Sequence, residues 1–242
     1  MLKNIKKVGI FVVFPMIIAL ATYAQAFQEL ANFFEGMTHL IDKEYLLNKI
    51  FLFPDYNQFE YLGGRSIFQL MPPYFFWVGC MIVSAESYLT RSKKYIQFMA
   101  ARKTTSFQLY QDIQKQSLVS SILFSFVFHL TIAILIVCGN NLATELGIVS
   151  ILQSISILFV THTLLIIGMM RVIFYIYLKK NEVVFVLTSA IVVGLLMMIN
   201  LVVPQLSIIF LWYDQFWIPS TVLAIILLLI AYILQKRIKF DF

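Results

Sequence analysis

The stretch "SLVSSILFSFVFHLTIAILIVC" (residues 117–138) contains no charged residue and consists mostly of aliphatic and aromatic side chains. A helix needs about 20 mostly apolar residues to cross the hydrocarbon core of a bilayer. The stretch therefore predicts a membrane-spanning helix. Five further windows are also mostly apolar and long enough to span, and they cover residues 8–27, 66–87, 147–173, 183–203 and 219–235.

The composition agrees with this interpretation over the whole chain. Hydrophobic residues make up 61% of the sequence and charged residues only 12%, whereas a soluble domain carries about 25% charged residues. No internal repeat and no soluble domain interrupts the pattern. We therefore predict an all-α, polytopic membrane protein of the cell (plasma) membrane, in which residues 1–242 form one domain of six transmembrane helices.

The basic residues predict the orientation, because Lys and Arg near the ends of spans remain on the cytoplasmic side. With both termini cytoplasmic, fifteen of the 18 Lys and Arg residues lie in inner segments. The outer segments hold Lys43, Lys49 and Arg65. The basic pI then follows from topology, so it gives no reason to expect a nucleic-acid partner.

The N-terminal residues also resemble a cleavable signal peptide, with a basic start, an apolar run and Ala24-Gln25-Ala26. The apolar run is long enough to anchor the chain, and we expect this first span to be retained. Cys80 and Cys138 lie within or at the edge of spans and have no metal-binding spacing. We expect both to be packing residues.

Two outer connections have features of their own. In the first, residues 28–65, the segment "LANFFEGMTHLIDKEYLLNKIFLF" (30–53) predicts a short amphipathic helix lying on the outer membrane surface. The fifth connection, "PQLSIIFLWYDQFWIP" (204–219), is nearly uncharged and rich in aromatic residues. It fits either an interfacial aromatic belt or a re-entrant hairpin that dips into the outer leaflet.

Motifs for catalysis are absent from the sequence. It has no phosphate-binding loop, no H-E-x-x-H zinc motif and no G-x-S-x-G turn. His129 and His162 fall inside spans three and four, where histidines can ligate a metal or relay protons. No acidic residue lies deep in a span beside them, so a hydrogen bond to a neighbouring helix is the simpler interpretation. We predict no catalysis, no metal and no cofactor in this chain.

Polar residues within the spans follow a pattern. Ser117, Ser121, Ser125 and His129 recur every four residues and form one stripe along span three. This stripe and the polar residues of spans four and five fit close helix packing or, as the alternative, a surface that lines a substrate path. Spans three to five should form the interior, and the sixth span should face lipid. The candidate interior residues are Ser121, Ser125, His129, Gln153, His162 and Asn200.

The inner stretch "SAESYLTRSKKYIQFMAARKTTS" (84–106) interleaves basic and aromatic residues. No Gly or Pro interrupts its first part, so span two can continue as a helix, and the hydroxyl residues at 104–106 can cap a new helix leading into span three. The stretch can anchor at lipid headgroups, bind anionic membrane lipid or dock into a cytoplasmic partner.

Six spans, inner termini and a helical loop between spans two and three resemble the type-two ABC exporter permeases, including the small permeases of bacteriocin and lantibiotic export or immunity. In that family a Glu leaving span two precedes a basic, aromatic stretch, and "ESYLTRSKKYIQF" (86–98) is similar. The resemblance implies that this loop is a coupling helix for a separate ATPase subunit. The implied coupling residues are Glu86, Tyr88, Arg91, Lys93, Lys94, Tyr95, Phe98, Arg102 and Lys103.

The resemblance further implies that ATP and magnesium bind to the partner ATPase and that a second permease subunit, identical or related, completes the transport path. The connection 204–219 is similar to the re-entrant outer element of that family. An amphipathic or apolar peptide is the expected substrate class. The alternative function is a non-transporting membrane scaffold or immunity protein whose inner loop recruits a cytoplasmic partner. An intramembrane hydrolase is the third hypothesis.

Overall fold

The computed structural model describes residues 9–33, 41–51, 71–89, 106–139, 142–143, 147–179, 182–202 and 217–236, and these residues are almost entirely helical. A π-helical turn, η1 (Gly9–Val13), leads into the first α-helix. The α-helices are α2 (Phe14–Phe33), α3 (Lys43–Ile50), α5 (Met71–Leu89), α7 (Ser106–Cys138), α8 (Ile148–Lys179), α9 (Glu182–Val202) and α10 (Trp217–Lys236). Two short strands, β1 (Ile41–Asp42) and β2 (Leu142–Ala143), pair in parallel.

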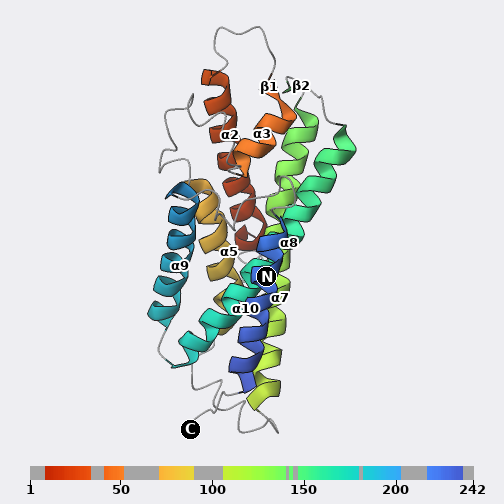
Figure 1. The fold of residues 1–242 in the computed structure, drawn as a ribbon. Helices are drawn as coiled ribbons and strands as arrows, with labels where there is room; N and C mark the ends of the chain where they lie inside the picture. Colours follow the sequence, from red (N-terminus) through yellow and green to blue (C-terminus); the bar gives the residue numbers. More distant parts are fainter. Residues whose placement is uncertain are drawn as a thin grey trace.

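Each of the six predicted windows overlaps a helix. Among the described residues, three helical segments are long and apolar enough to cross a membrane, namely Gly9–Asn32, Ser117–Cys138 and Ile148–Tyr175. The apolar parts of the other three helices are shorter, Met71–Ala85, Val183–Ile199 and Ser220–Gln235. In Figure 1, α7 rises from the lower end of the molecule and α8 returns to it, while α3 and the β1–β2 pair lie near the upper end.

Helix α7 is much longer than its apolar part. It contains 33 residues, which corresponds to a length of about 50 Å at about 1.5 Å per residue, whereas the hydrocarbon core is about 30 Å thick. The first turns of α7, residues 106–116, are polar and precede the apolar stretch. A helix that leads into span three was predicted, and α7, described from Ser106 onward, confirms it.

Aromatic side chains of α5 and α7 form the centre of the core. Trp77 and Phe76 of α5 are fully buried, and the Phe76 ring stacks on Phe128 with ring centroids 4.1 Å apart. The packing role predicted for Cys80 is confirmed, since its side chain is buried and lies 3.8 Å from the Ser121 carbonyl oxygen. Cys138 differs from the prediction, because it ends α7 with its side chain exposed.

The interior is not formed by spans three to five alone. The apolar span of α8 is 67% buried and that of α7 is 44% buried, and α5 and α2 supply much of the remaining core. Helix α9 lies at the periphery instead, where Leu187, Ile191 and Leu195 are exposed. Most of α9 is apolar, but Ser189 marks its inner side, since this side chain is fully buried and its hydroxyl donates to the Phe185 carbonyl oxygen.

Helix α10 packs closely on α8 at Gly168. A Cβ atom at this position would lie 3.0 Å from the Leu227 Cβ and 3.3 Å from the Ala224 carbonyl oxygen. The missing side chain therefore permits the close approach of the two helices. The opposite side of α10 exposes Ile and Leu side chains, among them Ile226 and Leu229, which agrees with a face toward lipid.

Candidate functional site

The short helix α3 and Phe51, the residue after it, cover two buried histidines that form the candidate site. Asp42 caps its start by accepting a hydrogen bond from the Glu44 backbone N–H at 3.3 Å. Leu46, Leu47 and Ile50 are buried against the other helices. The amphipathic helix was therefore predicted correctly, and its apolar face packs on other helices of the protein. The same apolar face that could dip into lipid packs on the bundle, which offers it closely fitted side chains.

Beneath α3, the two histidines of spans three and four form a pair. His129 of α7 and His162 of α8 are both buried, and His129 Nε2 lies 3.1 Å from His162 Nδ1. His129 Nδ1 lies 2.8 Å from the Ser125 carbonyl oxygen of the preceding turn. Beside the pair, the Thr163 hydroxyl donates to Ser125 Oγ at 2.8 Å. The site thus joins α7 to α8 through side-chain hydrogen bonds.

This geometry defines the tautomers of a neutral pair. A carbonyl oxygen only accepts hydrogen bonds, so His129 Nδ1 must carry its hydrogen and donate to Ser125. His129 Nε2 is then an acceptor, and His162 Nδ1 must be the donor to it. The hydrogen bonds therefore all run in one direction, from His162 through His129 to the α7 backbone.

Aromatic rings enclose the pair. Phe51, the residue that follows α3, stacks on His129 with ring centroids 5.8 Å apart and an interplanar angle of 13°. Trp77 of α5 meets His162 edge-on with ring centroids 5.3 Å apart. Water is excluded by such surroundings, and hydrogen bonds are electrostatically stronger there than in water. The arrangement can hold α7, α8, α5 and the end of α3 in one register.

A metal centre is not indicated by the described side chains. Across the described ranges, no three or more His, Cys, Asp or Glu side chains are grouped so that they could hold a metal ion. The two facing ring nitrogens already bond to each other. A hydrogen bond between neighbouring helices, the simpler of the interpretations of these histidines, is what the structure contains.

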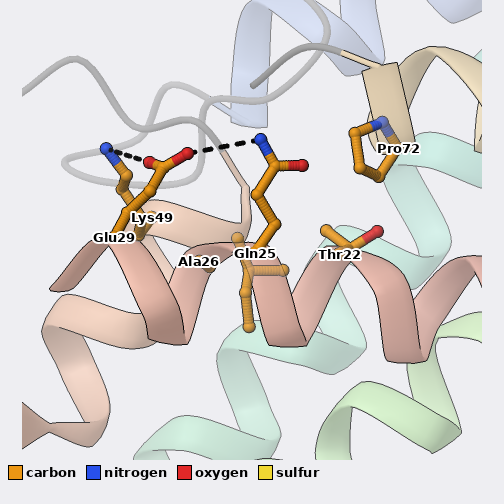
Figure 2. Close-up of a pocket in the computed structure, with 7 residues that line it drawn as sticks. Thr22, Gln25, Ala26, Glu29, Lys49 and Pro72 are labelled. Atoms are coloured by element: carbon orange, nitrogen blue, oxygen red, sulfur yellow. Dashed lines mark hydrogen bonds and ion pairs between the residues drawn. The ribbon is translucent and has the colours of Figure 1, made fainter. Parts of the chain in front are cut away.

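Polar contacts tie α3 to its neighbours on either side of the pair. Lys49 Nζ lies 2.8 Å from Glu29 Oε2 of α2, and Gln25 donates to the other Glu29 oxygen at 3.2 Å. Figure 2 shows these side chains around a cavity that also borders Thr22. At the other end of α3, the buried Lys43 donates to the Val137 carbonyl oxygen at 3.2 Å.

The predicted interior residues are only partly brought together. His129 and His162 form the pair, and Ser125 lies beside it. Ser121 is buried on the same stripe, but its hydroxyl bonds to the Ser117 carbonyl oxygen and lies 3.4 Å from the Met170 sulfur. Gln153 is exposed on α8. Asn200 lies in α9, and its side chain is outside the described part of the structure.

The predicted coupling residues lie at or beyond the end of α5. Glu86 and Tyr88 belong to the last turns of this helix, and only their backbone is described. The other coupling residues, Arg91, Lys93, Lys94, Tyr95, Phe98, Arg102 and Lys103, lie outside the described residues. The connection 204–219 also falls outside them as far as residue 216.

Three contributors to the site were missed from the sequence. Phe51 was one aromatic residue among many in an outer loop, and Lys49 was counted only as an outer charge. Glu29 lies within the first span segment Gly9–Asn32, beyond the window expected for that span. It follows Gln25 by four residues and Thr22 by seven, so the three share one helical face. The charge of Glu29 on that face could have indicated a basic partner.

Comparison with known proteins adds no identification, since no protein-family model, no curated protein and no solved structure matches the chain. The class follows from the fold alone. The chain is a helical protein with apolar helices of membrane-spanning length.

Proposed function

We propose that the chain is the membrane-spanning permease subunit of an ATP-driven exporter, with six spans and both termini in the cytoplasm. ATP is hydrolysed on a separate cytoplasmic ATPase subunit, and the inner segment 88–106 couples the two. The observation that carries the proposal is the long helix α7, whose polar first turns extend the chain beyond the apolar span. An inner protrusion of this kind provides a surface on which a soluble subunit can dock.

The charge of the inner segment supports the same function. Helix α5 ends at Leu89 and α7 begins at Ser106, so the basic and aromatic residues connect two helices that pack on each other. Membrane anchoring needs only basic side chains near the headgroups. Aromatic and Arg residues together are typical of protein–protein hot spots.

Two cavities lined by described residues are too small for a transport path. The two cavities described within the chain have volumes of about 20 and 10 Å³, which is room for about one water molecule each. A peptide requires far more space than that. As the resemblance to exporter permeases implies, we place the path between two permease subunits, and an amphipathic or apolar peptide remains the proposed substrate class.

Energy coupling provides the test of this proposal. The chain purified alone should hydrolyse no ATP, because its sequence lacks a phosphate-binding loop. The tagged chain isolated from its native membrane should retain a subunit with such a loop, and the complex should hydrolyse ATP. Hydrolysis by the chain alone would contradict the proposal. A retained partner without ATPase activity would instead favour the membrane scaffold or immunity protein.

A further inference from the structure

Three of the contacts that hold helix α3 differ in chemistry and in exposure to water. At its first residue, the buried Lys43 ammonium group caps the end of α7 by bonding to the Val137 carbonyl oxygen, where the helix dipole favours a positive charge. Just beyond its last residue, the fully buried Phe51 ring lies on both histidines, with centroids 5.8 and 5.9 Å from His129 and His162.

The third contact, between Lys49 and Glu29, is the most accessible of the three. The side chains of Lys49 and Glu29 are 18% and 24% exposed, respectively, although their charged atoms are 2.8 Å apart. Ion pairs that water reaches are weak and are screened by salt. This contact is therefore the point at which α3 separates most readily from α2.

A cavity of about 20 Å³ adjoins the ion pair, and residues from α2, α3 and α5 line it. Thr22, Gln25 and Glu29 give it a polar wall along one face of α2 (Figure 2). A cavity of this size and polarity can hold a water molecule. Ile50 borders the cavity, and the next residue, Phe51, covers the histidine pair. A water molecule at the Glu29–Lys49 ion pair is therefore next to Ile50, the residue that precedes the Phe51 ring over the histidine pair.

We propose that α3 with Phe51 is a plug, latched to α2 by the Glu29–Lys49 ion pair, that closes the helix bundle over the His129–His162 pair. When the latch opens, α3 lifts at its Phe51 end and admits water to the pair, while Lys43 retains the opposite end on α7. The plug needs no ATPase, so it goes beyond the proposed exporter function and does not depend on it.

The test measures the access of a water-soluble reagent to a thiol under the plug. Ser125 is fully buried beside the histidines, and Ser125→Cys places a thiol there in a chain that also carries Cys80→Ser and Cys138→Ser. The protein is held in lipid nanodiscs, in which both faces are open, so the result does not depend on the orientation in the cell. The probe is a small, neutral, hydrophilic maleimide.

With the latch intact, the thiol should react slowly. Glu29→Gln or Lys49→Met should increase the rate about fivefold, which is the scale of a partly exposed ion pair. The charge exchange Glu29→Lys with Lys49→Glu restores the pair and should return the rate to within about twofold of the starting value. As the matched control, Gln28→Ala removes an exposed polar side chain from α2 beside Glu29 and should leave the rate unchanged.

Salt tests the same latch without a mutation in it. At about 1 M salt the Debye length falls to about 3 Å, so the rate should increase about as much as in Glu29→Gln, and salt should have little further effect on that variant. Equal rates in all variants, or fast labelling with the latch intact, would overturn the plug. If the latch variants fail to fold, a rate independent of salt in the intact chain would overturn it equally.

Discussion

Tyr95→Ala or Arg91→Ala should abolish the capture of the ATPase subunit while leaving the chain in the membrane. Both residues lie in the segment between α5 and α7, outside the proposed spans, so insertion does not depend on them. If the segment docks into an ATPase, a few aromatic and Arg anchors carry most of the binding energy, about 2 kcal/mol or more for each one truncated. Such a loss weakens binding by about thirtyfold. The measurement is a pull-down of the ATPase with each variant.

Charge reversal in the same segment should behave differently. Lys93→Glu with Lys94→Glu should weaken capture mainly at low salt, because charges at the rim of an interface act through a long-range attraction that salt screens. Ser92→Ala is the matched control, a small change in the same segment, and should capture the ATPase normally. If the ATPase still binds when Tyr95 and Arg91 are both truncated, the segment serves only as a headgroup anchor.

Substitution of one histidine of the buried pair should destabilise the fold, because the remaining histidine loses a hydrogen bond. His162→Leu leaves the facing His129 nitrogen without its present partner in an aromatic enclosure, and a buried polar atom left without a hydrogen bond costs about 1–3 kcal/mol. His129→Leu has the same consequence for His162. Replacement of both by Leu removes both polar groups, so the double variant should lose clearly less stability than the sum of the two single losses.

Thermal unfolding in detergent measures this effect. In a chain with Trp212→Phe and Trp217→Phe, the fluorescence of Trp77 reports on it, because the ring centroids of Trp77 and His162 are 5.3 Å apart. Gln153→Leu is the control, since it removes an exposed polar side chain from the same helix and should change stability little. Strictly additive losses from the two histidine substitutions would show that they do not act as a pair.

The helices could be predicted because hydropathy over about 20 residues is a strong local property. The face of α7 was predictable as well, since Ser117, Ser121, Ser125 and His129 repeat at helical spacing and are all buried. The residues that pack against that face were not predictable. Polar residues are spread around most of the circumference of α8, so nothing local distinguished the buried His162 from the exposed Gln153.

The packing partners of α3 could not be predicted from the sequence either. A short helix with an apolar face and two lysines fits a membrane-surface helix and a packed helix equally well. Lys43 and Lys49 suggested solvent, yet one bonds to the end of α7 and the other to Glu29 of α2. Those partners belong to other helices, and periodicity carries no information about contacts between separate helices.

The exporter proposal requires the segment between α5 and α7 to lie on the cytoplasmic side of the membrane, because an ATPase can bind it only there. Single cysteines at Asn57, Thr105 and Gln215, in a chain with Cys80→Ser and Cys138→Ser, are treated with an impermeant thiol reagent in sealed cells. We expect Asn57→Cys and Gln215→Cys to be labelled, and Thr105→Cys to be labelled only after the membrane is permeabilised. Labelling of Thr105→Cys in sealed cells would place the segment outside and contradict the account.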